Sequence, residues 1–172
     1  MLRFQKLSSG FGFREADRGG EMIRKAKTTD EAAVRDCAEG AYTRYVALIG
    51  RKPAPMIADF AAQIASDQVY VAVDGNDELQ GFIVFFPDDG HMFLENVAVR
   101  PEVAGRGVGK SLIQFCEAEA ERLGLGGVHL YTNEKMAENL SIYPRLGYQE
   151  VGRRSEHGFN RVFFEKHFDR SN

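Results

Sequence analysis

Three alternating glycines, Gly105, Gly107 and Gly109, are the feature of the sequence best suited to binding a ligand. They follow a β-branched stretch that stops at Pro101, and they precede an amphipathic run from Ser111 to Leu123. Glycines at a helix start let the backbone approach a ligand closely, and the first N–H groups of the helix then favour an anion. The segment therefore predicts a phosphate-binding turn between a strand and a helix.

Two phosphate-binding patterns compete for this segment. The dinucleotide fingerprint G-x-G-x-x-G needs its third glycine one residue later and an acidic residue about 20 positions further on. The corresponding stretch, Gly127–Leu130, contains no carboxylate, so this pattern fails. The nucleotide P-loop fits Ala104–Ser111 except at Ala104, but it also needs an acidic Mg²⁺ ligand at the end of a later strand, and the next strand ends in Asn133. The P-loop is kept as the less favoured alternative.

A third pattern, [QR]-x-x-G-x-[GA] after a strand, fits residues 104–109 with Ala104 in its first position. A second motif, Glu138–Tyr148, reads ENLSIYPRLGY and follows one strand later. In type and order the two motifs resemble the acyl-CoA pyrophosphate loop and the "lYeklGF" helix of the GNAT superfamily of N-acetyltransferases. The resemblance extends from Met22 to Phe168. It implies direct transfer of an acetyl group from acetyl-CoA, the co-substrate, to a primary amine.

The resemblance also implies where acetyl-CoA would bind. Backbone groups of the strand before the loop would pair with pantetheine, and one N–H would polarise the thioester carbonyl. Successive N–H groups of the loop would hold the pyrophosphate, with Arg106 and Lys110 adding positive charge unless they are merely solvated cations. Asn139 and Asn133 would contact pantetheine, although the family more often has a small residue at 139 and Asn in place of Met136. The expected cofactor-binding residues are Val97, Ala98, Val99, Ala104, Gly105, Arg106, Gly107, Val108, Gly109, Lys110, Asn133, Asn139 and Tyr143.

Tyr143 is the candidate catalytic acid. A phenol is neutral at pH 7, so it can donate a proton to a departing thiolate. The alternative is a core tyrosine on an amphipathic helix, because aromatic stripes usually serve packing. The resemblance favours the catalytic role, since the family has its tyrosine at this position of the second motif.

Glu95 is the candidate base, acting on the acceptor amine directly or through water. Alternation along a strand places Glu95 on the same side as Phe93, Val97 and Val99. The alternative is an ordinary strand carboxylate paired with a neighbouring cation. The four histidines show no metal-ligand spacing, so no metal is expected.

Periodicity and turn signals predict the elements that position these residues. Strands are expected at 22–27, 68–73, 79–86, 91–99, 128–133, 148–153 and 161–168, and helices at about 29–38, 54–65, 109–123 and 136–146. The order β-α-α-β-β-β-α-β-α-β-β indicates an α/β (α+β) fold. Its mixed, mostly antiparallel sheet would be flanked by helices, as the GNAT resemblance implies.

Composition limits the classes of partner. The chain has 172 residues, 44% of them hydrophobic and 27% charged, with a formal net charge of −3. These values predict one soluble domain, residues 22–172, after a flexible extension, residues 1–21, and they disfavour a nucleic-acid partner. No apolar stretch approaches the ~20 residues of a membrane span, and no signal peptide is recognisable. Two cysteines without metal spacing suggest a reduced, cytoplasmic protein. A homodimer is left open.

The acceptor is expected to be a small amine. The segment Tyr42–Met56 carries Arg44, Arg51 and Lys52 among aromatic residues. If this segment forms the acceptor pocket, these cations suggest an acceptor with a carboxylate beside its amine, although exposed cations are usually just solvated.

Overall fold

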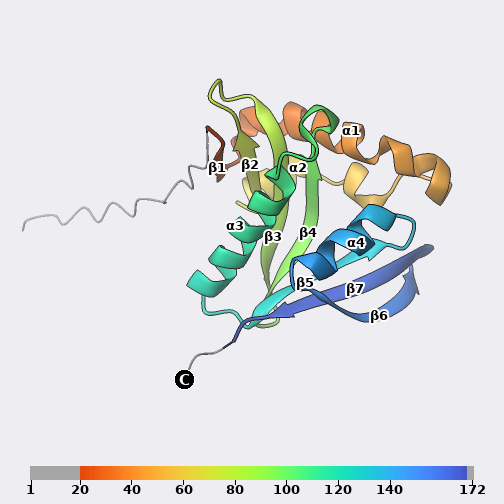
Figure 1. Ribbon diagram of the computed structural model, residues 1–172. Coiled ribbons are helices and arrows are strands. Elements are labelled where there is room, and N and C mark those ends of the chain that lie inside the picture. Colours follow the sequence, from red (N-terminus) through yellow and green to blue (C-terminus); the bar gives the residue numbers. More distant parts are fainter. Residues whose placement is uncertain (1–19, 170–172) are drawn as a thin grey trace, which may run out of the picture.

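The computed structural model describes residues 20–169, which form seven strands and four α-helices (Figure 1). The strands are β1 (Met22–Lys25), β2 (Val69–Val73), β3 (Leu79–Asp88), β4 (His91–Val99), β5 (Gly127–Asn133), β6 (Gln149–Glu156) and β7 (Phe159–His167). The helices are α1 (Glu31–Ile49), α2 (Phe60–Ala65), α3 (Val108–Arg122) and α4 (Ala137–Arg145). This is the predicted order. The predicted extension, residues 1–21, lies outside the described residues except for Gly20 and Glu21.

The strands within residues 20–169 form one sheet in the order β1-β2-β3-β4-β5-β7-β6. All neighbours are antiparallel except β4 and β5, which are parallel. That parallel ladder contains only two residue pairs, Met92 with Val128 and Phe93 with His129. Beyond these pairs the two strands separate, so the sheet opens at its centre. The predicted mixed, mostly antiparallel sheet is confirmed.

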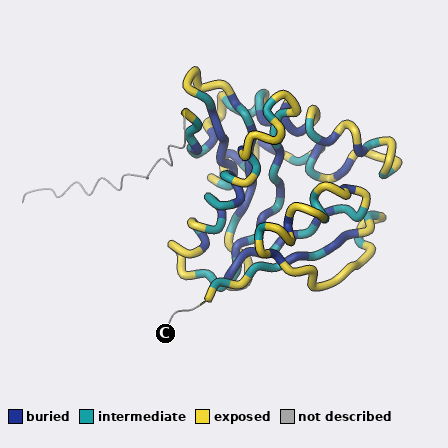
Figure 2. Tube along the Cα trace, in the orientation of Figure 1, coloured by how far each residue is buried: buried dark blue, intermediate teal, exposed yellow. Residues whose placement is uncertain are grey.

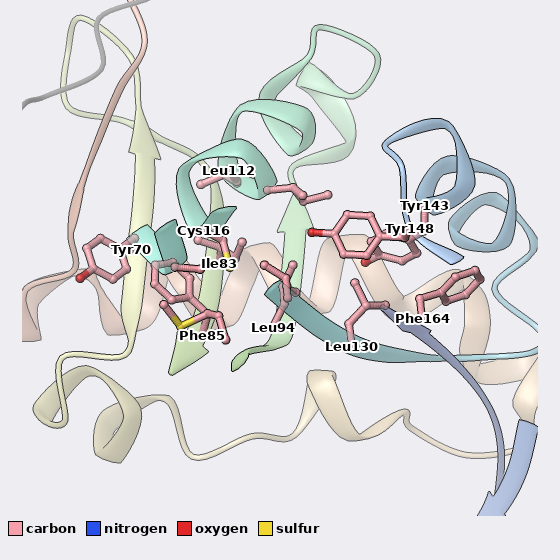
Figure 3. Close-up of a cluster of buried hydrophobic side chains, with 14 of the residues drawn as sticks. Tyr70, Ile83, Phe85, Leu94, Leu112, Cys116, Leu130, Tyr143, Tyr148 and Phe164 are labelled. Atoms are coloured by element: carbon pink, nitrogen blue, oxygen red, sulfur yellow. The ribbon is translucent and has the colours of Figure 1, made fainter. Parts of the chain in front are cut away.

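The helices cover the two faces of the sheet and create two hydrophobic cores. On one face α3 and α4 pack over β3, β4, β5 and β7, and their core includes Leu112, Cys116 and Phe164 (Figures 1 and 3). On the other face α1 and α2 pack over β2, β3 and β4, around Phe60 and Phe82. Figure 2 shows the buried residues along the central strands and the exposed ones on the edge strand β6, on the outer sides of the helices and at the turns. A ligand in the central opening therefore has access to both faces.

An irregularity in β4 changes the direction of its side chains. Val84 on β3 pairs with Asn96. The next residue of β3, Phe85, pairs with Leu94, so Glu95 is an extra residue on β4. A bulge of this kind leaves one residue outside the ladder and re-aims the side chains that follow.

Because of the bulge, the side chains of β4 do not alternate between the two faces of the sheet as predicted. Val97 and Val99 pack against the core on the α3 side, together with Leu94. Glu95 instead contacts Gln63 of α2, on the opposite face. The prediction that Glu95 shares a side with Val97 and Val99 was wrong, because strict alternation assumes a strand without an extra residue.

Two other local predictions also differ from the structure. The helix predicted over residues 54–65 is divided into a 3₁₀ turn, Ala54–Met56, and α2, because Asp59 caps the N-terminus of α2 by accepting a hydrogen bond from the N–H of Ala62 at 3.1 Å. The first helix was predicted to end near residue 38, but α1 continues to Ile49, so the first half of the expected pocket segment Tyr42–Met56 is helical. Tyr42 is therefore held on a helix rather than on a flexible connection.

Candidate active site

A cavity of about 330 Å³ lies where β4 and β5 separate. Its walls include Leu94–Val97 of β4 and Tyr131–Asn133 of β5. Tyr143 and Asn139 of α4 line it from one face of the sheet, and Gln63 of α2 lines it from the other. The cavity thus passes through the opening in the sheet, and it brings together Glu95, Val97, Asn133, Asn139 and Tyr143 among the predicted site residues.

Glu95 enters the cavity from the bulge, is half-buried, and forms no ion pair with any residue in the range 20–169. Burial raises the pKa of its carboxyl group, and a hydrogen bond donated by Gln63 Nε2 to Glu95 Oε2 partly lowers it. The other amide atom, Gln63 Oε1, is buried and has no hydrogen-bond partner among the described residues. The carboxylate is therefore more basic than usual, and an unused acceptor lies beside it.

Tyr42 and Asn96 hold the bulge in place. The Tyr42 hydroxyl lies 2.8 Å from both Asn96 Oδ1 and the carbonyl oxygen of Val97, so its single proton is shared between two acceptors. Asn96 Nδ2 donates to the carbonyl of Pro55 at 3.2 Å. The Val97 carbonyl is one of the groups expected to pair with pantetheine, and it would have to accept that contact with its second lone pair.

Tyr143 lines the cavity and is only 5% exposed. Its ring packs against Tyr148 at a centroid distance of 5.7 Å and against Phe164 at 5.6 Å, on the side of the core nearest α4 (Figure 3). Burial raises the pKa of its phenol, so the group stays protonated at neutral pH. No described residue forms a hydrogen bond with its hydroxyl. The phenol is therefore both a packing residue and a proton donor open to the cavity.

The two asparagines expected to contact pantetheine are partly occupied by other contacts. Asn139 Nδ2 donates to Thr132 Oγ1 at 3.1 Å, which ties α4 to β5. Asn133 Oδ1 accepts from the N–H of Lys135 at 2.9 Å and forms the turn before α4. Both residues still line the cavity. Asn139 retains a free carbonyl oxygen for a ligand, whereas Asn133 mainly shapes the turn.

The predicted anion-binding turn precedes α3. Gly105 and Gly107 both have left-handed backbones, with φ of 81° and 86°, and no atom lies within 4 Å of where a Cβ would stand on either. Within the described part of the chain, none of the N–H groups from Gly105 to Lys110 has an acceptor; the first paired one is Ser111, which donates to the Gly107 carbonyl at 3.0 Å. Such a row of free donors at a helix N-terminus fits a pyrophosphate group.

The two arginines expected in the acceptor pocket have other partners. Arg44 forms a bidentate ion pair with Glu138, at 2.6 and 3.1 Å. Arg51 lies 3.7 Å from the ring centre of Phe159 and donates to the carbonyl of His157. Neither residue lines the cavity. The arginine that does is Arg161 of β7, which the sequence had not singled out.

Comparison with known proteins identifies the family. The profile of the acetyltransferase (GNAT) domain matches residues 65–150, half of the chain. The chain belongs to the GNAT family. The expected resemblance to this family is therefore confirmed.

Two curated proteins and one solved structure are similar to this chain. Probable N-acetyltransferase 14 of Xenopus tropicalis is 28% identical over 91 residues, 52% of this chain and 44% of that protein. Mycothiol acetyltransferase of Actinosynnema mirum is 34% identical over 86 residues, 48% of this chain and 28% of that protein. The chain thus matches less than half of the length of either curated relative. The structure of the PaiA N-acetyltransferase of Thermoplasma acidophilum with coenzyme A superposes with a TM-score of 0.72 at 18% identity, covering 86% of this chain and 99% of that one.

Several polar residues of this GNAT site could not have been selected from the sequence. Gln63, Asn96 and Arg161 reach the cavity because of the bulge, the position of α2 and the pairing of β7 with β5. The one available signal was Asn96, a second polar residue directly after Glu95 in a mostly apolar strand. No group of three or more potential metal ligands occurs within residues 20–169. None of the helices in that range has the length and apolar character that a membrane span requires.

Proposed function

We propose that this GNAT enzyme transfers an acetyl group directly from acetyl-CoA to the primary amine of a small acceptor. The supporting observation is that one cavity joins Tyr143 on the α4 face of the sheet to Glu95 on the α2 face. The free N–H groups of residues 105–110 support a pyrophosphate at the start of α3, on the same face as Tyr143. Acetyl-CoA would thus approach from the α3 and α4 side, and the acceptor from the other. A cytoplasmic location belongs to the same proposal.

The two catalytic residues divide the proton transfers between them. The amine nitrogen attacks the thioester carbonyl, so a C–N bond forms while the C–S bond breaks. Glu95, directly or through one water, takes the proton that leaves the nitrogen. Tyr143 gives its phenolic proton to the departing thiolate and recovers one from solvent. The raised pKa of Glu95 suits its role, because the carboxylate becomes a stronger base. The raised pKa of Tyr143 keeps its phenol protonated at neutral pH but makes it a weaker acid, so positioning against the thiolate must contribute to the transfer.

Ligand-dependent melting tests the binding half of the proposal. Acetyl-CoA should raise the melting temperature, since a ligand that binds only the native state at about 100 times its Kd stabilises that state by ~2.7 kcal/mol. ATP with Mg²⁺ should have no effect. A shift with ATP and none with acetyl-CoA would favour the nucleotide P-loop alternative.

Release of free thiol from acetyl-CoA tests the catalytic half. A panel of amino acids, polyamines, aminoglycosides and short peptides should contain at least one amine that accelerates release. Acetyl-CoA binding without release by any amine would instead favour a non-catalytic acyl-CoA sensor. Repeating the screen with Tyr143→Phe distinguishes enzymatic transfer from spontaneous acetylation.

A further inference from the structure

Arg161 is a buried cation that faces the acceptor side of the cavity. Its side chain is 10% exposed, and the residue lines the cavity together with Tyr131 and Phe159. The guanidinium carbon lies 4.3 Å from the ring centre of Tyr131 and 5.8 Å from that of Phe159. A buried charge needs partners, and a guanidinium offers five N–H donors in a fixed plane. The position of this plane is set by the rings before any ligand arrives.

The protein itself satisfies only part of this donor set. Arg161 Nη1 donates to Glu156 Oε2 at 3.0 Å, and Nε and Nη2 have no acceptor anywhere in residues 20–169. Neither of these nitrogens is fully buried, and Arg161 forms part of the cavity wall. Two N–H groups on one edge of a guanidinium match the spacing of the two oxygens of a carboxylate.

The charges around Arg161 leave it free to attract an anion. Glu156 is shared, because Arg154 Nε lies 3.4 Å from its Oε1 atom. The group Arg154–Glu156–Arg161 therefore carries a net positive charge. The other charged side chains that line the cavity are Glu95 and Asp59, both carboxylates suited to an ammonium group. The cavity thus offers one cationic region and one anionic region.

We propose that Arg161 binds a carboxylate of the acceptor, which makes the preferred substrate a small molecule that carries both a primary amine and a carboxylate. The inference rests on the proposed acetyl transfer and names its substrate class. With the carboxylate on Arg161, the amine lies toward Glu95, the base on the opposite wall. A cavity of about 330 Å³ suits a small acceptor. Polycationic amines are disfavoured, since they would place a positive charge against Arg161.

The test compares each amino acid with its own carboxamide and with the amine left by its decarboxylation. Thiol release from acetyl-CoA is measured at fixed pH with the full chain, with Arg161→Gln and with Arg154→Gln. Arg154 is the matched control, because it contacts the same glutamate from the paired strand but does not line the cavity.

The wild-type chain should prefer the best amino acid over its carboxamide. Arg161→Gln should lower kcat/KM for that amino acid about 100-fold, mainly through KM, while changing the carboxamide by less than about 3-fold. Arg154→Gln should preserve the preference. Equal losses of amino acid and carboxamide in Arg161→Gln would make Arg161 a purely structural residue and overturn the inference. A wild-type preference for carboxamides or polyamines would overturn it as well.

Failure of the proposed reaction would look different from failure of this inference. If acetyl-CoA neither binds nor is consumed, the proposed function itself fails. If acetyl-CoA binds but no amine is turned over, melting in the presence of coenzyme A decides the inference: amino acids should raise the melting temperature of the wild-type chain and not that of Arg161→Gln. The absence of such a difference would refute carboxylate binding at Arg161.

Discussion

Gln63 on α2 donates a hydrogen bond from Nε2 to Oε2 of Glu95 on β4, and this contact joins the acceptor-side helix to the candidate base. The hydrogen bond opposes the effect of burial on the pKa of Glu95. It also leaves Gln63 Oε1 buried without a partner, in a position to accept an N–H of the incoming amine or of a water. Gln63 thus holds the carboxyl group of the candidate base in position.

Replacing Gln63 with Leu should raise the pKa of Glu95 further, because burial would then act without the opposing hydrogen bond. We expect the acid limb of the kcat/KM profile to move to higher pH. At neutral pH kcat/KM should fall roughly 10-fold, the value of one hydrogen bond to a charged group. Gln80→Leu is the control, since Gln80 makes a similar contact with Asp74 but does not line the cavity. An unshifted acid limb would show that Gln63 does not tune Glu95.

Changing Glu95 to Gln should depress kcat/KM most at low pH, where the amine is protonated and needs a base. The rate should recover as pH rises and free amine becomes available. A pH–rate profile with the best acceptor measures this. An equal loss at every pH would make Glu95 a positioning residue.

The same Glu95→Gln substitution should increase the stability of the fold at neutral pH, although it lowers kcat/KM. The raised pKa means that the fold prefers the protonated acid, so ionisation of Glu95 costs stability as pH rises through its ordinary and then its raised pKa. The variant should therefore have a larger free energy of unfolding than the wild type at neutral pH. This difference should vanish below the ordinary pKa of glutamate. Denaturant titrations at several pH values check the sign.

Tyr143 and Tyr148 pack edge to face, and they provide a matched pair of substitutions. Tyr143→Phe should lower kcat by about 10²–10⁴ while leaving acetyl-CoA affinity within a few-fold, because only the proton donor is lost. Tyr148→Phe should keep kcat but lose about 1 kcal/mol of stability, because its hydroxyl donates to Glu117 Oε1 at 2.9 Å. If kcat were undiminished in Tyr143→Phe, the role of Tyr143 would be packing alone.

Alanine substitutions of two glycines, one at each end of α3, distinguish the effect of backbone strain from an effect on ligand binding. Gly107 and Gly124 both have left-handed backbones, with φ of 86° and 70°, and both face open space. An alanine at either position should cost roughly 1 kcal/mol of stability. Only Gly107→Ala should also weaken acetyl-CoA binding, because it alters the row of free N–H groups. Equal acetyl-CoA affinities in calorimetry would argue against the predicted pyrophosphate site.

The sequence was sufficient for the order of elements and for the glycine turn, because both depend on local periodicity and local backbone freedom. It was insufficient for the acceptor side of the cavity. Glu95 lines the cavity, but the prediction that it shares a side with Val97 was wrong, because the bulge depends on the pairing of β4 with β3. Arg44 was selected for its surroundings in sequence, but the fold pairs it with Glu138, which lies 94 residues away. Arg161 lines the cavity through a contact between strands that no local pattern could indicate.

The two-pair ladder between β4 and β5 has a consequence for folding cooperativity. Strands β1 to β4 form one hydrogen-bonded unit, and β5 to β7 form another, joined by this short ladder and by side chains of the shared core. A pantetheine chain lying in the opening would act as a missing strand and add backbone hydrogen bonds between the units. Without it, the second unit should open more readily, with faster amide hydrogen exchange in β5 and β7 than in β2 and β3. The concentration of coenzyme A would then determine whether the chain unfolds in one step or in two.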